Sequence, residues 1–152
     1  MNAPAVSQKQ VDIPSAEMQR LWFATLKKEW NCLAVIPAHP GGSASVVGKS
    51  LAKVASLHKE SSIKLISGEG CDLTGASRLI IDMTSHVSQG GIVIVVLDSV
   101  VSNPAGVPVA LAADAALLCV QLGQADTESG RRTIELIGEN RFVGAVTFNA
   151  KA

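Results

Sequence analysis

Short, continuous apolar runs separated by segments with helical spacing constrain the fold of this chain more than any other feature. The clearest run covers residues 92–98 (IVIVVLD), and its length and β-branched content predict a strand buried on both faces. Four further predicted strands cover 32–38, 62–67, 115–123 and 142–149. Because helical segments lie between these runs, we expect a three-layer α/β domain in which helices cover both faces of a parallel, Rossmann-like sheet of about five strands.

The predicted helices follow from apolar residues that recur at helical spacing. A first helix begins near Pro14 and Ser15, and another begins at Ser43. The core stripe expected for this second helix contains Val46, Val47, Leu51, Val54 and Leu57. Segment 79–83 is ambiguous because RLIIDM can also form a strand, but Leu79, Ile80, Met83 and Val87 favour a helix. The segment VPVALAAD is expected to be a short helix or turn, and 126–140 a capped helix.

Composition and charge narrow the class of protein. The 152 residues carry 13 basic and 13 acidic side chains, so no nucleic-acid-binding surface is expected. We interpret 1–13 as a disordered arm and 14–152 as one domain. Neither a signal peptide nor a membrane-spanning stretch is expected, which predicts a cytoplasmic protein. Three widely separated cysteines without metal-ligand spacing are expected to be buried, reduced thiols.

A Gly48-Lys49-Ser50 sequence raises the question of a nucleotide site. A phosphate-binding loop has the form G-x-x-x-x-G-K-[ST], in which the lysine leaves from the first turn of the helix. Here Gly42 lies six positions before Gly48 rather than five. The helical pattern also places Lys49 in the second turn, so we interpret it as an exposed helix residue. His39, in the preceding loop, is expected to be exposed as well.

When the loop is aligned from the end of the preceding strand, a family resemblance emerges. The stretch AHPGGSASVVGKSLAKVA resembles the phosphate loop of bacterial tyrosine kinases of the capsular and exopolysaccharide class, relatives of the MinD/ParA ATPases, with the pattern Ala-x-Pro-Gly-Glu-Gly-Lys-[Ser/Thr]-Thr. Pro40 and Gly41 match this pattern. The second glycine of the family is Ser43 here, its phosphate-binding lysine is Ala44, and its Mg²⁺-binding hydroxyl falls on Ser45.

The resemblance continues downstream and covers roughly residues 14–149. Asp98 occupies the position of the family's Walker B aspartate, and Asp114 and Asn149 match its later AD and terminal N. The first helix keeps Glu17 and Arg20 of an oligomerisation motif Glu-x-x-Arg-x-x-Arg, but has Phe23 at the last arginine. The family's second aspartate loop has no counterpart, a strand and its helix are missing before residue 62, and the chain contains no tyrosine.

The resemblance implies a phosphate-loop ATPase-like core whose activity is degenerate, because the phosphate-binding lysine is absent. We expect an accessory or regulatory binding subunit in polysaccharide synthesis or export. Two alternatives stay open: an active ATPase or tyrosine kinase with an unorthodox loop, using Lys49, and a MinD/ParA-like positioning protein. Under the resemblance, Asp98 is the catalytic candidate, ATP or ADP with Mg²⁺ is the cofactor to test, and the loop candidates are Pro40, Gly41, Gly42, Ser43, Ala44, Ser45 and Lys49.

Partners follow from the same resemblance. Trp22 and Phe23 give the first helix an apolar face, which we expect to mediate self-association or docking, together with Glu17 and Arg20. The expected partner is a membrane polysaccharide co-polymerase or another export protein, which would hold the chain at the periphery of the inner membrane. No metal site is expected.

Overall fold

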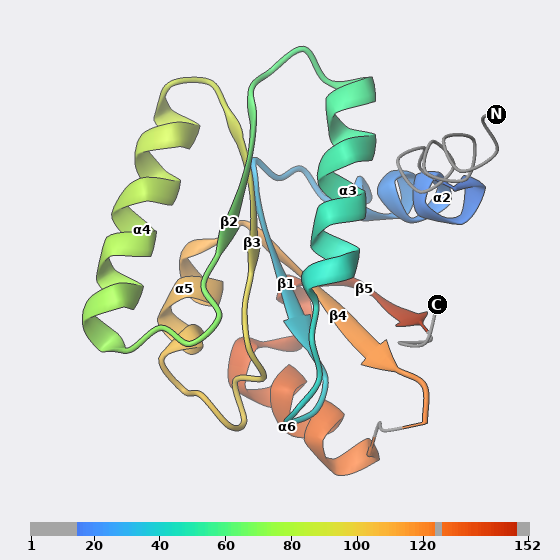
Figure 1. Ribbon diagram of the computed structural model, residues 1–152, viewed down its shortest axis with the longest axis vertical. Coiled ribbons are helices and arrows are strands. Elements are labelled where there is room, and N and C mark those ends of the chain that lie inside the picture. Colours follow the sequence, from blue (N-terminus) through green and yellow to red (C-terminus); the bar gives the residue numbers. More distant parts are fainter. Residues whose placement is uncertain (1–14, 124–125, 149–152) are drawn as a thin grey trace, which may run out of the picture.

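A five-stranded parallel sheet forms the centre of the protein, as seen in a computed structural model that describes residues 15–123 and 126–148 (Figure 1). The strand order is β2-β3-β1-β4-β5. The strands are β1 (Cys32–Pro37), β2 (Ile63–Ser67), β3 (Ile92–Val96), β4 (Ala115–Gln121) and β5 (Phe142–Phe148). The helices are α2 (Ala16–Thr25), α3 (Ser45–His58), α4 (Leu73–Ser88), α5 (Gly106–Ala112) and α6 (Thr127–Ile137), followed by a 3₁₀ turn (Glu139–Arg141). The three-layer parallel fold expected from the sequence is confirmed.

Buried strands explain the continuous apolar runs. Every residue of β1 and β3 is buried, and these strands pair with each other in parallel from Cys32 opposite Val93 to Val35 opposite Val96. Strands that bury both faces need apolar residues at every position, which is the pattern read in the sequence. The edge strands β2 and β5 are more exposed, and β2 mixes apolar and polar side chains.

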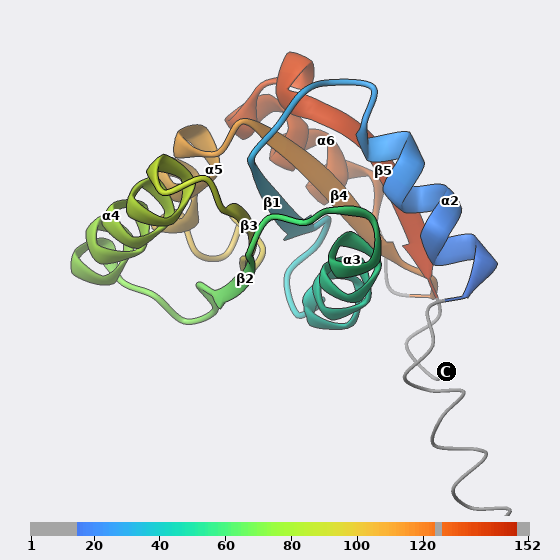
Figure 2. The ribbon, with the colours of Figure 1, turned by 90° about the horizontal axis from the view of Figure 1, so that it is seen from above.

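Helices cover the two faces unequally, as the view from above shows (Figure 2). Helices α2 and α3 pack on one face, where Trp22, Leu51 and Val54 join the core around Val35. Helices α4, α5 and α6 pack on the other face. This division follows from right-handed crossovers, in which the direction of the step along the sheet decides the face that the connecting helix covers. The step from β1 to β2, which contains α3, runs in one direction. The steps from β2 to β3, β3 to β4 and β4 to β5, which contain α4, α5 and α6, run in the other.

Side-chain caps fix where three of the helices begin. Ser15 accepts a hydrogen bond from the backbone N–H of Met18 (3.1 Å) at α2. Asp72 accepts from Gly75 (2.7 Å) at α4. Asp126 accepts from the backbone N–H of Ser129 (2.7 Å) at α6, and this bond lowers the pKa of its carboxyl group. Such caps satisfy N–H groups that have no partner within the helix.

The structure settles several local predictions. Segment 79–83 lies inside α4, so the helix prediction is confirmed, and VPVALAAD forms most of α5. Two members of the expected α3 core stripe are wrong, because Val46 and Leu57 are each 66% exposed. Strand β3 ends at Val96, two residues before the predicted end of the run. The arm predicted for 1–13 and Asn149 lie outside the described residues.

Candidate functional site

The carboxyl ends of the strands present the loops from which a ligand site would be built. The chain leaves β1 toward α3 on one face of the sheet, whereas β3 and β4 lead to α5 and α6 on the other face. In open parallel sheets, a crevice forms where neighbouring strands send their connections to opposite faces. The loop 38–44 after β1 is therefore the first place to test for a site.

This loop is folded tightly against the sheet and α6. The backbone N–H of Ala38 donates to the carbonyl of Cys119 (2.8 Å), and the Thr133 hydroxyl lies 3.5 Å from the Ala38 carbonyl. The N–H of Gly42 donates back to the carbonyl of His39 (3.1 Å) across a turn in which Gly41 has φ +82°. A positive φ of this size favours glycine, which explains Gly41 without reference to phosphate.

His39 is buried inside the loop, which corrects the expectation of an exposed histidine. Its side chain is 3% exposed, and its Nδ1 lies 3.0 Å from the carbonyl of Pro40. Because a carbonyl only accepts, this geometry places a proton on Nδ1. The Nε2 atom has no hydrogen-bond partner among the residues that the structure describes. A Cβ on Gly42 would lie 3.0 Å from the imidazole, so the ring fills the interior of this turn.

Ala44, at the position of the family's lysine, is part of the hydrophobic core. It is 0% exposed and belongs to the apolar cluster beneath α2 and α3. It precedes the first turn of α3 and provides no side-chain cap. The N–H of Ser45 is bonded to the Ser43 hydroxyl (3.2 Å). Helix α3 therefore brings a methyl group to the place where a phosphate loop needs a cation.

Helix–sheet packing explains why position 48 is a glycine. A Cβ at this position would lie 2.4 Å from Cγ2 of Val96 and 3.6 Å from Cδ1 of Leu65. Glycine therefore lets α3 approach β3 and β2 closely. Lys49 follows in the second turn of α3, as predicted, and lines surface pockets on the side of β2. The Gly-Lys-Ser sequence is thus a packing contact followed by an exposed lysine.

Asp98 lies just beyond the end of β3, and its carboxylate holds neighbouring loops in place. Oδ2 accepts a hydrogen bond from the backbone N–H of Gly70 (2.5 Å) and another from Nδ2 of Asn103 (3.3 Å). The same Asn103 amide donates to the carbonyl of Cys71 (3.1 Å). The Asp98 carboxylate therefore ties the β2–α4 loop to the β3–α5 loop.

The loops after β1 and β3 follow adjacent strands, yet within 15–123 and 126–148 no hydrogen bond joins 38–44 to 98–103. The β1 loop instead approaches Glu69. The carboxylate of Glu69 lies 3.4 Å from the hydroxyls of both Ser43 and Ser67. Glu69, Ser67, Ser45 and Lys49 line a small pocket of about 220 Å³. Ser45 and Lys49 thus line one pocket with Glu69, whereas the Asp98 carboxylate is bonded to Gly70 and Asn103.

The α2 residues divide into a buried and an exposed set. Trp22 is 1% exposed and packs edge-on against Trp30 with ring centroids 5.6 Å apart, so it does not contribute to an outer face. Phe23 is 56% exposed and contacts the ring of His58 at 5.0 Å. Glu17 lines an apolar groove between α2, α3 and β5. Of these two aromatic residues, Phe23 and not Trp22 is accessible to a docking partner.

Cysteine chemistry and metal binding have little support in the described part of the chain. Burial raises the pKa of the Cys32 and Cys119 thiols to about 12 in each case. Asp114, which lies near Cys32, uses its carboxylate to accept the backbone N–H groups of Asn31 (2.8 Å) and Cys32 (3.0 Å). No cluster of three or more His, Cys, Asp or Glu side chains suited to a metal ion occurs among the described residues.

Two features of the loops at the carboxyl ends of the strands could not be predicted from the sequence. Asn103 and Glu69 hold the loops together, but each has partners that are distant in sequence, so no local pattern identifies them. The burial of His39 also depends on the contacts of its loop. The only signal in the sequence was its position directly after a buried strand.

Comparisons with known proteins leave the family open: neither a scan against protein-family models nor a search of curated proteins found a match. Among the described residues, no helix has the length and apolar character needed to cross a membrane.

Proposed function

We propose that this chain is a non-catalytic binding subunit built on a phosphate-loop-like scaffold, a degenerate relative of the exopolysaccharide tyrosine kinases. It would act as an accessory or regulatory protein in polysaccharide synthesis or export, on the cytoplasmic side and next to a membrane co-polymerase. The observation that carries the proposal is the burial of Ala44, which is 0% exposed at the position aligned with the family's lysine. The polysaccharide context rests on the resemblance alone.

Phosphoryl transfer depends on positive charge at the outer phosphates, where negative charge is redistributed in the transition state. Here the loop offers backbone N–H groups and a helix N-terminus, which attract anions weakly, but no cation. The buried imidazole of His39 fills part of the same loop. The carboxylate of Asp98 is engaged by Gly70 and Asn103, which supports a structural role for this residue.

A titration with Mg²⁺-ATP tests the proposal. We expect no shift in thermal stability, whereas ligand at one hundred times its dissociation constant would stabilise the fold by about 2.7 kcal/mol. A stabilisation of that size, accompanied by ATP turnover, would contradict the proposal. If it occurred, Lys49→Ala would distinguish the second candidate: loss of the shift in this variant, but not in the exposed control Lys27→Ala, would assign phosphate binding to Lys49.

The partner is tested separately. Purified chain should bind the cytoplasmic segment of the co-polymerase produced by the same cell, and Phe23→Ser should weaken this binding because Phe23 is the exposed aromatic residue of α2. Unchanged binding in Phe23→Ser would remove α2 from the docking surface. No binding to any cytoplasmic segment of the export machinery would remove the polysaccharide assignment.

A further inference from the structure

The edge of the sheet at β2 is open, and its backbone is available for a further strand. Strand order places β2 at the end of the sheet, paired only with β3. The N–H of Ile92 donates to the carbonyl of Ser62 (2.8 Å), and the N–H of Gly68 donates to the carbonyl of Val96 (2.7 Å). Since backbone groups alternate along a strand, the even-numbered residues of β2 face β3 and the odd-numbered ones face outward.

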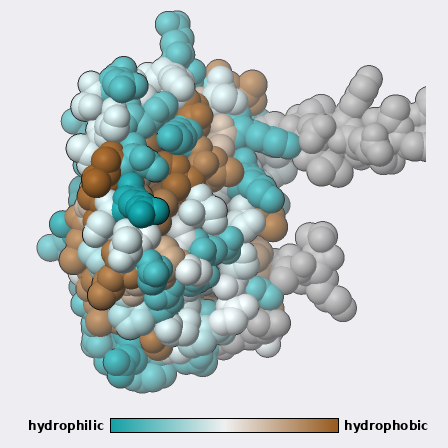
Figure 3. Space-filling model, turned by 60° about the vertical axis from the view of Figure 1, so that its left-hand side comes forward, coloured by the Kyte–Doolittle hydropathy of each residue, from teal (hydrophilic) through white to brown (hydrophobic). Residues whose placement is uncertain are grey.

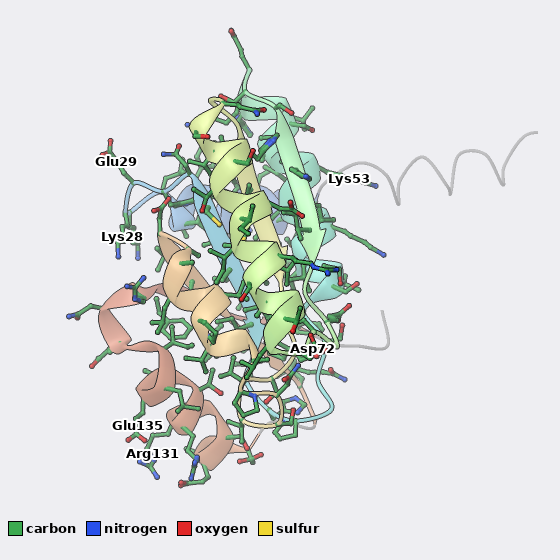
Figure 4. The ribbon with its side chains drawn as sticks, turned by 90° about the vertical axis from the view of Figure 1, so that its left-hand side faces the viewer. Lys28, Glu29, Lys53, Asp72, Arg131 and Glu135 are labelled. Atoms are coloured by element: carbon green, nitrogen blue, oxygen red, sulfur yellow. The ribbon has the colours of Figure 1, made fainter. Side chains whose placement is uncertain are left out.

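The outward groups are those of Ile63, Leu65 and Ser67. No hydrogen bond from another described residue reaches the backbone N–H or C=O of these three. Helices normally cover both faces of a parallel sheet, but an edge strand presents unpaired N–H and C=O groups with which another chain can pair. Figures 1 and 4 show β2 lying between α3 and α4 with no further strand beside it.

The surface beside this edge combines apolar and basic side chains. Ile63, Leu65 and Ala52 line a pocket of about 390 Å³ together with Lys49, Lys53 and Ser56. Leu65 is 39% exposed. The pocket lining contains no acidic residue, and Figure 4 shows Lys53 extending on the α3 side of the strand. Figure 3, turned toward the α4 side of Figure 1, shows apolar surface interrupted by polar side chains.

The charges at the two ends of the strand differ from the charge at its centre. Lys64, in the middle of β2, is exposed and adds to the basic character of this edge. Glu60 precedes the strand, and Glu69 follows it next to Ser67. Arg78 and Asp82 lie on the exposed side of α4. An incoming segment would therefore carry its acidic residues at the centre and not opposite Glu60 or Glu69.

We propose that the edge of β2 binds an extended acidic segment of a partner protein, which adds a sixth strand to the sheet. Main-chain hydrogen bonds to Ile63, Leu65 and Ser67 would provide affinity, and Lys49 and Lys64 would select acidic side chains. A segment of about five residues matches the length of β2. This inference rests on the proposed function as a binding subunit, but it concerns a different surface from the loop 38–44.

A labelled peptide in which valine and glutamate alternate over seven residues provides the probe, with binding followed by fluorescence anisotropy. We expect Lys49→Glu to weaken binding about fivefold, whereas Lys27→Glu, which makes the same charge change outside this pocket, leaves it unchanged. Methylation of two backbone nitrogens of the peptide should weaken binding about tenfold, because it removes two inter-strand donors. A peptide with lysine in place of glutamate should not bind.

Hydrogen exchange locates the contact. Binding should slow amide exchange at Ile63, Leu65 and Ser67, the outward-facing residues, and leave that of Lys64 and Ile66 unchanged because these already face β3. Protection at the opposite edge, β5, would overturn the proposal. So would equal binding of the methylated peptide, or an absence of binding at millimolar peptide.

Self-association is the remaining competitor for this edge. Protection of the same three amides that rises with protein concentration, without peptide, would assign the edge to a second copy of this chain and would overturn the proposal. None of these outcomes depends on whether ATP binds, so failure here and failure of the proposed function can be told apart.

Discussion

Gly48→Ala tests whether the Gly-Lys-Ser sequence exists for packing. The added Cβ would lie 2.4 Å from Cγ2 of Val96, roughly 1 Å closer than two carbons approach without repulsion. Val96 is 3% exposed in a central strand, and its β-branched side chain has few rotamers to move into. Relief therefore requires a shift of α3 away from the sheet.

The size of the effect follows from two opposing contributions. Overpacking a core by one methyl group costs about 1–3 kcal/mol, while alanine is preferred over glycine in a helix by about 1 kcal/mol. Gly130→Ala in α6 isolates the second contribution, because a Cβ there would meet its nearest neighbour, Ala38, at an ordinary 4.0 Å. We expect Gly130→Ala to raise the free energy of unfolding. The free energy of unfolding of Gly48→Ala should be about 1–3 kcal/mol lower than that of this control.

Urea denaturation of both variants measures the difference in the free energy of unfolding. A double-mutant cycle then identifies the cause: in a Val96→Ala background, which removes Cγ2, the penalty of Gly48→Ala should largely disappear. If Gly48→Ala stabilised the protein as much as Gly130→Ala does, the packing explanation would be refuted. The glycine would then need a role in the loop or in ligand binding.

Three further predictions concern stability. Asp98→Ala should cost about 1 kcal/mol of unfolding free energy, because it removes the hydrogen bonds that the carboxylate accepts from Gly70 and Asn103; an unchanged urea midpoint would remove the structural role. Trp22→Ala should cost about 3–5 kcal/mol, as expected for a large buried aromatic side chain, and a loss below 1 kcal/mol would contradict its burial. Burial keeps Cys32 and Cys119 protonated with folded pKa values near 12, against an ordinary value of 9.0. Their contribution to stability is therefore complete below pH 9 and is lost as the pH rises from about 9 toward 12, since only the unfolded thiols ionise in that window. Alkylation at pH 8 should modify both cysteines only after unfolding; rapid reaction of the native protein would disagree.

The fold could be predicted because its determinants are local. A run such as IVIVV in β3 has no polar face, so only a strand covered on both sides accommodates it, and the helices between such runs require crossovers. Segment 79–83 was ambiguous for the same reason, because an apolar run suits either element. The segment lies inside α4, which is 16 residues long and begins at a cap formed by Asp72, and these two features favour the helix.

The site could be predicted less well because its contacts are not local. Asp98 and Gly70 are 28 residues apart in the sequence, so nothing near Asp98 shows that its carboxylate is engaged. Trp22 and Phe23 are neighbours on one helix turn, and the sequence does not say which of them faces the sheet. Since the residues differ by about 100° around the helix axis, one is buried and the other is exposed.

Helix α3 links the two proposals. Buried Ala44 directly precedes its first turn, and Gly48 and Lys49 follow one turn later. The close approach allowed by Gly48 is also what places Lys49 beside Leu65 at the open edge of β2. A shift of α3 in Gly48→Ala should therefore weaken binding of the acidic peptide as well as lower stability, although no lysine is changed. Gly130→Ala should neither weaken peptide binding nor lower stability. If a destabilised Gly48→Ala variant bound the peptide with unchanged affinity, the position of α3 would not influence binding at the β2 edge. The lysines of α3 would then not select the bound segment.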